Sequence, residues 1–382
     1  MMKPSASSLP GLTPLRGIAA LGVAVFHFQV YFIRFIDKDK SMFVDKLYLM
    51  VDLFFIMSGF LILHVYKEYF AEKINLVSFK KFIVARFARV YPLHFITLLA
   101  LIGLYFIQRG NLESSYDPHA IASHIFLLHS FPFNKELTWN APSWSISAEW
   151  WSYILFPVLC LFIAKNKKFA VSVLALCVLA FYILLLFYVP RNDAPTNGEL
   201  HNLDITYDYG FLRSFAGFIS GMLLYLFYSV DAVKKIFSGD VFCGLGILVA
   251  IASLQLGVPD IVFIPIFCML VLLVTCNTGK ITGVFNNKVL NYLGDISYSV
   301  YMLHFLLIVF TTKTFYKLGY RFDYAKGLPF FKGAALCAAY VLVLLTLSAI
   351  SYRFVEKPCR SYFNRKWAGS RSAGAISSIA EN

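Results

Sequence analysis

The sequence predicts an all-α fold, a polytopic transmembrane bundle of about ten helices. Three observations predict it: 59% of the 382 residues are hydrophobic, only 14% are charged, and the mean hydropathy is +0.68. Soluble domains carry about 25% charged residues. The net charge of +13 therefore indicates the basic loops of a membrane protein and not a nucleic-acid partner, because excess Lys and Arg gather in cytoplasmic loops.

Ten apolar segments are long enough to cross a bilayer. They lie at 14–35, 43–66, 88–108, 148–165, 168–189, 209–229, 241–257, 260–276, 291–312 and 333–355. The shorter apolar stretch 119–131 contains three histidines and is expected at the interface or as a re-entrant piece. Residues 1–11 are expected to be a disordered cytoplasmic terminus, 12–358 a single membrane domain and 359–382 a basic cytoplasmic tail.

The loop charges predict the orientation of the bundle. Lys and Arg concentrate in 67–87, in 165–168 and after 353, whereas the loop 190–208 is mostly acidic. With an even number of spans the basic segments share one side, so both termini are predicted to be cytoplasmic. The seven cysteines form no CxxC pair and no metal-ligand spacing, and we expect neither a disulfide framework nor a metal site.

The first segment contains Arg16 and, near its middle, His27. His27 lies eleven residues after Arg16, which places it roughly 16 Å deeper along a helix. An ionisable residue at that depth is costly and is therefore a candidate functional residue. Asp52 in the second segment is expected at the same depth, where it would orient His27 and raise its basicity. A polar pair that merely joins two helices is the alternative.

Arg86 and Arg89 stand three residues apart in ARFARVYPLHF, so they share one helix face. Pro92 favours the first turn of the third membrane helix. Two guanidinium groups beside the free N–H groups of a helix N-terminus suit phosphate groups. Ordinary anchoring at the lipid interface is the alternative.

The segment 139–157, WNAPSWSISAEWWSYILFP, places Glu149 at the expected outer end of a membrane helix. Aromatic rings can stack on sugar faces, so Trp144 and Trp151 with Glu149 are candidates for binding a sugar. An interfacial aromatic belt would explain the tryptophans but not the carboxylate. A further block, NYLGDISYSVYMLHF, ends near His304, which is expected near the midplane as a second proton relay. Close packing of two helices is the alternative for this block.

Together these blocks resemble the membrane-bound acyltransferase-3 family in its stand-alone form, from residue 12 to about 358. The resemblance rests on Arg16 and His27 with ten residues between them, VDLFFIMSGFLI, Arg86-x-x-Arg89, Trp144-Ser145-x-x-x-Glu149, SYSVYMLH ending in His304, and Glu356-x-Pro358. Ile146 departs from the pattern, since many members have leucine there.

The resemblance implies an integral-membrane O-acyltransferase of the bacterial inner membrane. It would move an acyl group, usually acetyl, from cytoplasmic acyl-CoA to a carbohydrate hydroxyl of lipopolysaccharide, exopolysaccharide or another cell-surface glycan, with no permanently bound cofactor. The family's essential histidine and arginine correspond to His27 and Arg16, and its CoA-phosphate ligands to Arg86 and Arg89.

We therefore assign three groups of candidate residues. His27, Asp52, Arg16 and Glu149 are expected to be catalytic, Arg86 and Arg89 to bind acyl-CoA, and Trp144, Glu149, Trp151 and His304 to bind the acceptor. His27 would act as general base or carry the acyl group covalently. The alternative function is a proton-coupled transporter or flippase of a polar substrate, in which His27, Asp52 and His304 relay protons.

Overall fold

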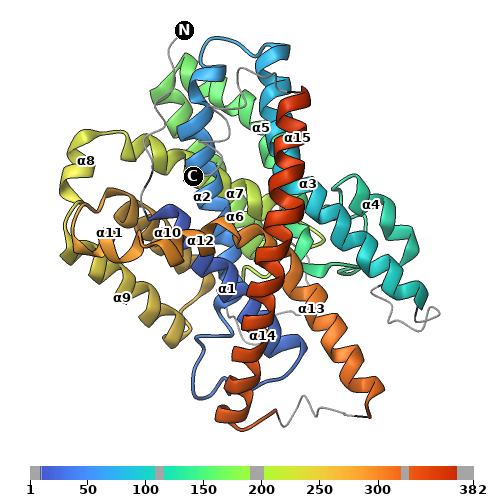
Figure 1. Ribbon diagram of the computed structural model, residues 1–382. Helices are drawn as coiled ribbons and strands as arrows, with labels where there is room; N and C mark the ends of the chain where they lie inside the picture. Colours follow the sequence, from blue (N-terminus) through green and yellow to red (C-terminus); the bar gives the residue numbers. More distant parts are fainter. Residues whose placement is uncertain (1–8, 10, 108–115, 190–201, 320–326, 368–382) are drawn as a thin grey trace.

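The computed structural model describes residues 9, 11–107, 116–189, 202–319 and 327–367, which form a bundle of helices (Figure 1). Helices are the only regular elements in these ranges, so the all-α prediction is confirmed. The long helices are α1 (Leu12–Tyr31), α2 (Met50–Phe70), α3 (Leu76–Ile107), α5 (Trp144–Lys165), α6 (Lys167–Phe187), α7 (Gly210–Tyr228), α9 (Asp240–Leu256), α10 (Asp260–Cys276), α13 (Ser297–Lys317) and α14 (Phe330–Ser351).

Shorter pieces connect them. These are α4 (Ile121–Ile125), α8 (Asp231–Ile236), α11 (Lys280–Phe285), α12 (Lys288–Asp295), α15 (Lys357–Trp367), the 3₁₀ turns η1 (Leu47–Leu49), η2 (Pro118–Ala120) and η3 (Ala141–Ser143), and the π turn η4 (Tyr352–Glu356).

Each of the ten predicted segments contains one long helix. Within the described ranges, seven helical runs are long and apolar enough to cross a membrane. α9 and α10 are apolar but have 17 residues each, and α1 is not among the seven. These runs support an integral membrane protein, while the count of ten spans and the side of the termini stay predictions.

Two predicted spans have other bounds in the structure. α3 begins at Leu76, not near residue 88. The predicted span 291–312 breaks at Ile296 into α12 and α13, because α12 lies against α1, where Gly17 and Gly294 allow close approach. The helix after 333 continues through η4 into α15, so the predicted boundary at 358 falls inside a helical run. Residues 1–8, 10 and 368–382, most of the two predicted tails, lie outside the described part.

The closest helix pair is α2 with α7. A Cβ added at Gly59 would lie 1.9 Å from the carbonyl oxygen of Phe218, and one at Gly221 would lie 1.9 Å from that of Ile56. Small residues let membrane helices pack backbone to backbone. This contact fixes which faces of α2 and α7 meet, and it therefore decides the partner of every polar side chain on those faces.

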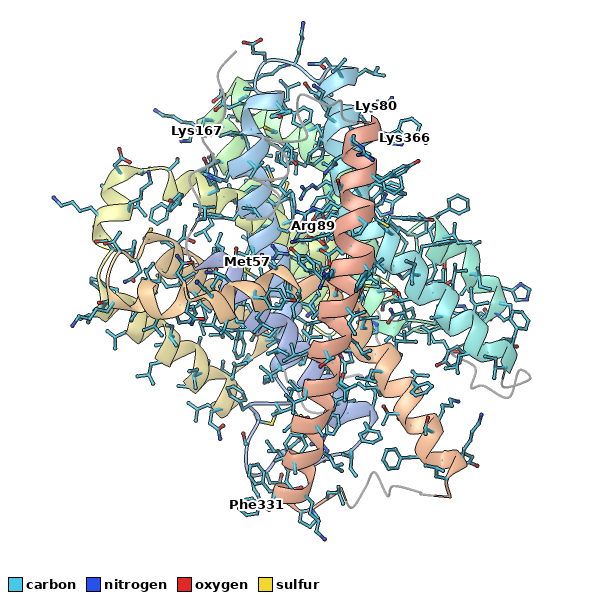
Figure 2. The ribbon with its side chains drawn as sticks, in the orientation of Figure 1. Met57, Lys80, Arg89, Lys167, Phe331 and Lys366 are labelled. Carbon is cyan, nitrogen blue, oxygen red and sulfur yellow. The ribbon has the colours of Figure 1, made fainter. Side chains whose placement is uncertain are left out.

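Basic residues of separate segments share one end of the molecule. Figure 2 shows Lys80 of α3, Lys167 of α6 and Lys366 of α15 at the same end, with Phe331 of α14 at the other. The common basic end that the positive-inside argument needs is therefore present, and its assignment to the cytoplasm stays a prediction.

Candidate active site

A cavity opens between α1, α2, α3, α5 and α13. Four charged residues line it: Arg16, Arg86, Arg89 and Glu149. Hydroxyl groups of Ser58, Ser145, Tyr153, Ser297, Tyr298 and Tyr301 line it as well. Figure 2 shows two lining residues, Arg89 and Met57, near the centre of the bundle. Residues that the sequence presents as separate blocks thus meet in one space, and three positive charges against one negative make it suited to an anion.

Arg86 is buried, and only some of its hydrogen-bond donors have a partner among the described residues. One Nη donates to the Tyr66 hydroxyl at 3.1 Å, and the guanidinium lies over the rings of Tyr66 and Tyr153. Its Nε is buried with no hydrogen-bond partner among the described residues. Arg86 and Arg89 share a face as predicted, but α3 begins ten residues before Arg86. The expected free N–H groups of a helix N-terminus are therefore not beside the pair, and that part of the prediction is wrong.

Arg16 lies at the same cavity because α1 packs closely on the start of α13. A Cβ added at Gly17 would lie 2.8 Å from the backbone nitrogen of Gly294. Arg16 Nη2 donates to Ser297 Oγ at 3.5 Å. Arg16 therefore belongs with Arg86 and Arg89, far along the helix from His27, and not at the position of a catalytic group beside the imidazole.

His27 pairs with His304, not with Asp52. His27 Nδ1 lies 2.9 Å from the carbonyl oxygen of Val23 and 3.3 Å from His304 Nε2. The other nitrogen of His304, Nδ1, faces the carbonyl oxygen of Tyr301. A carbonyl only accepts, so both imidazoles carry their proton on Nδ1, and His27 also donates toward His304. This tautomer leaves the lone pair of His27 on Nε2, where it can take a proton.

Asp52 is held in a separate ion pair. Its two carboxylate oxygens accept from Arg213 Nε at 2.9 Å and Nη2 at 2.6 Å, and both side chains are at most 1% exposed. The predicted contact between Asp52 and His27 is therefore wrong. Asp52 and Arg213 lie on the faces of α2 and α7 that the glycines bring together, and Arg213 contacts both carboxylate oxygens of Asp52.

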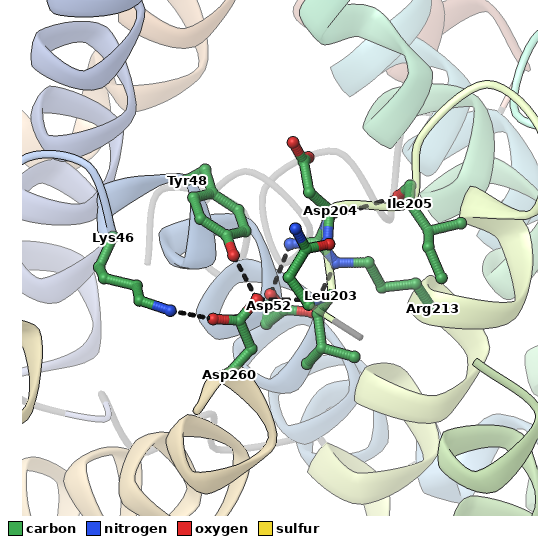
Figure 3. Close-up of polar contacts among 9 residues, drawn as sticks. Lys46, Tyr48, Asp52, Leu203, Asp204, Ile205, Arg213 and Asp260 are labelled. Carbon is green, nitrogen blue, oxygen red and sulfur yellow. Dashed lines mark hydrogen bonds and ion pairs between the residues drawn. The ribbon is translucent and has the colours of Figure 1, made fainter. Parts of the chain in front are cut away.

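The ion pair is part of a network that fixes the segment before α7 (Figure 3). Arg213 Nη1 donates to the carbonyl oxygen of Ile205 at 3.3 Å. Asp260, at the start of α10, accepts from the backbone N–H of Leu203 at 2.7 Å, from Lys46 and from the Tyr48 hydroxyl. Residues 203–205 are thus tied to α2, α7 and α10 at once.

Tyr301 separates the cavity from the histidine pair. It lines the cavity, and its ring centroid lies 5.5 Å from that of His304. Its hydroxyl lies 2.6 Å from Ser145 Oγ and donates to the carbonyl oxygen of Pro142 at 3.0 Å. The cavity therefore reaches to within one side chain of His304 and His27.

The two tryptophans predicted to stack on sugar are used in packing. Trp144 is 5% exposed, lies under the Arg213 guanidinium at 5.3 Å and contacts Phe55. Trp151 donates to the carbonyl oxygen of Leu127 at 2.8 Å. Trp144 is not among the residues that line the cavity, and its sugar-binding role stays a prediction. Glu149 was predicted to lie at the outer end of its helix beside these tryptophans. In the structure it lines the cavity together with the arginines.

The histidines of the predicted interfacial stretch form a buried stack. The rings of His124 and His129 lie 3.9 Å apart and nearly parallel, and His94 of α3 continues the stack 5.5 Å from His129. His129 Nε2 lies 3.0 Å from Ser143 Oγ. Burial lowers the pKa of His129 to about 3. The stack holds the 116–143 segment against α3, whereas His119 is exposed.

Two charged residues near the site were not singled out as candidates from the sequence. Arg213 lies inside the predicted span 209–229, and an arginine at membrane depth is the same signal that singles out His27. Glu356 entered only as part of a motif. It is 3% exposed and accepts from Ser299 Oγ at 3.1 Å. The π turn η4 places it there, and such turns recur at functional sites.

Comparison with known proteins identifies the chain. Residues 9–353 match the family model of the acyltransferase-3 domain, described as an acyltransferase domain. The chain belongs to the acyltransferase-3 family. This membership favours the enzyme over the transporter or flippase. No solved structure matches the chain.

Three relatives show the spread of the family. The chain is 23% identical to the acyltransferase MdmB of Streptomyces mycarofaciens, over 96% of this chain and 95% of that protein. It is 23% identical to the O-acetyltransferase OatA of Staphylococcus aureus, over 92% of this chain and 57% of that protein. It is 24% identical to YrhL of Bacillus subtilis, named as a putative peptidoglycan O-acetyltransferase, over 92% of this chain and 55% of that protein. The chain thus spans little more than half the length of OatA and YrhL.

Proposed function

We propose that this protein is a bacterial inner-membrane O-acyltransferase that moves an acetyl group from acetyl-CoA to a hydroxyl of a cell-surface glycan. One observation carries the proposal. A cavity lined by Arg16, Arg86 and Arg89 lies one side chain away from the pair formed by His27 and His304. In this pair Nε2 of His27 keeps its lone pair. The names of relatives such as OatA, an O-acetyltransferase, support acetyl as the transferred group.

The cavity is proposed to hold the donor. Guanidinium groups bind phosphate through paired, charge-assisted hydrogen bonds, and the unpartnered Nε of Arg86 is a donor still to be used. With the phosphates at the arginines, the arm that carries the thioester would extend past Tyr301 toward His27. Arg16 is therefore proposed to bind the donor, and Glu149 to hold Arg86 and Tyr153 in place by its charge.

His27 is proposed to be the general base. Its Nε2 takes the proton of the acceptor hydroxyl as the oxygen attacks the thioester carbonyl. The new C–O bond forms, the C–S bond breaks, and the proton passes from His27 to the departing thiolate, which leaves as CoA. His304 keeps the lone pair of His27 on Nε2 and thereby acts as a positioning residue.

The acceptor is proposed to approach beside Tyr31. Its ring stacks on that of His27 at 5.6 Å and 12° and is 41% exposed, so it offers a face for a sugar in place of Trp144. Asp204, an exposed residue, lies within electrostatic range of Tyr31. In Figure 3 its carboxylate points away from the Asp52–Arg213 pair. A carboxylate next to an aromatic face suits sugar hydroxyl groups.

The test is transfer of radiolabelled acetyl from acetyl-CoA into the glycan fraction of membranes that carry the protein. We expect label with the unchanged protein and none with His27→Ala at matched expression. The control is His119→Ala, which removes an exposed histidine and should leave transfer unchanged. Label that persists in His27→Ala would remove His27 from the chemistry. Substrate-dependent proton flux in vesicles without acyl-CoA would instead favour the transporter.

A further inference from the structure

α15 brings another arginine, Arg360, close to Arg89, which lines the donor cavity. The Lys80 ammonium lies over the Trp367 ring at 5.2 Å, and the rings of Phe87 and Phe363 lie 5.5 Å apart. α15 therefore runs antiparallel to α3. Continuing this register by one turn places Arg360 level with Arg89. The sequence pattern gave no reason to single out Arg360, because it lies in a stretch that reads as a basic tail.

Arg360 is half-buried beside like charges. Its Nη2 atom is buried and has no hydrogen-bond partner among the described residues. Its charged neighbours are Arg89, Glu356 and Arg86. A guanidinium in a partly buried site is costly unless its N–H groups are paired, and proximity to two further guanidinium groups adds repulsion. Something of negative charge is needed to make this cluster favourable.

The protein supplies too little of that charge itself. Glu356 lies within electrostatic range of Arg89 and Arg360, and it also accepts from Ser299. Among the described residues, the carboxylates near Arg16, Arg86, Arg89 and Arg360 are Glu149 and Glu356, with Asp295 close to Glu356. Four positive charges against these three negative ones leave an excess of positive charge, which a bound phosphate group would offset.

We propose that Arg360 binds a phosphate group of the acyl-CoA donor together with Arg89, which makes the donor site a cluster of arginines from α1, α3 and α15. This inference rests on the proposed function, since it assumes that CoA occupies the cavity. The shared chemistry is phosphate, and the diphosphate and the 3′-phosphate of CoA are its two sources. Arg360 is then a binding residue of the donor and takes no part in proton transfer.

The experiment measures equilibrium binding of CoA and of 3′-dephospho-CoA to the purified full-length protein in detergent. Arg360→Gln should weaken CoA binding roughly 10- to 100-fold, the range for loss of a charge-assisted hydrogen bond. Arg360→Lys keeps the charge but loses the paired donors, and it should weaken binding less. Arg353→Gln is the matched control, because Arg353 is an exposed arginine of the neighbouring π turn and should leave binding unchanged.

Each outcome decides the proposal. If Arg360→Gln weakens CoA binding but leaves 3′-dephospho-CoA binding as in the unchanged protein, Arg360 binds the 3′-phosphate. If both ligands are weakened by the same factor, it binds the diphosphate. Unchanged CoA affinity in Arg360→Gln and Arg360→Lys, with folded protein shown by its unfolding temperature, would overturn the inference and leave the proposed function intact. Failure of the unchanged protein to bind CoA would overturn both.

Discussion

Neutralising Asp52 should destabilise the protein through Arg213 and not through His27. The carboxylate and the guanidinium are joined by two hydrogen bonds of 2.9 and 2.6 Å in a site at most 1% exposed. Asp52→Asn leaves the buried guanidinium without its counter-charge, and breaking a buried pair in this way costs about 3–5 kcal/mol. Arg213→Met leaves the carboxylate uncompensated and should cost a similar amount. The double variant removes both charges, so it should regain on the order of 2 kcal/mol or more relative to the sum of the single losses.

The assay measures the free energy of unfolding in detergent for four proteins: the unchanged protein, the two single variants and the double variant. Unfolding is monitored by tryptophan fluorescence during denaturant titration. Acetyl transfer per folded molecule is measured in parallel. We expect Asp52→Asn to lower stability far more than it lowers turnover of the folded fraction. Single losses that add to within about 0.5 kcal/mol would refute the ion-pair reasoning. A variant of full stability with lost turnover would restore Asp52 as the partner of His27.

Four further outcomes are expected. His304→Gln should lower kcat at least about 10-fold with the KM for acyl-CoA unchanged, in steady-state kinetics, because His304 positions His27 and does not touch the donor. Trp144→Ala should cost about 3–5 kcal/mol of stability, and a raised acceptor KM in the folded enzyme would instead restore its sugar-binding role. Gly59→Ala should lower the unfolding temperature because its Cβ would meet the Phe218 backbone, whereas Gly103→Ala, with nothing within 4 Å, should not. Because the folded protein holds His129 at a pKa of about 3 against about 6.5 unfolded, stability should fall by about 1.4 kcal/mol per pH unit from pH 6.5 toward 3, and His129→Asn should flatten that slope.

The helices could be predicted because an apolar run of membrane length leaves the chain few alternatives. The apolar runs in the sequence did not predict where a helix breaks or where it continues. The break at Ile296 is set by the packing of α12 on α1 through Gly17 and Gly294. The continuation into α15 is set by its contact with α3 through Phe363. Both depend on a partner helix, which composition within one segment does not reveal.

The prediction that Asp52 pairs with His27 failed for a similar reason. Matching the depth of Asp52 and His27 says nothing about the face on which each lies. Asp52 and Gly59 are seven residues apart and so share a face of α2, while Arg213 and Gly217 share a face of α7. The glycines mark the faces that meet. Helical spacing from those glycines, applied to the sequence alone, would have predicted the pair.

The proposed mechanism divides donor binding from proton transfer along a single helix, α1, and this division has a kinetic consequence. α1 places Arg16 at the cavity, beside Ser297 of α13, and places His27 beside His304 of the same helix. The two positions on α1 are roughly 16 Å apart by helical rise, and Tyr301 lies between them. Loss of an arginine removes contacts that the donor makes throughout the reaction, so it should raise the KM for acyl-CoA. Loss of either histidine removes an interaction needed only during transfer, so it should appear in kcat.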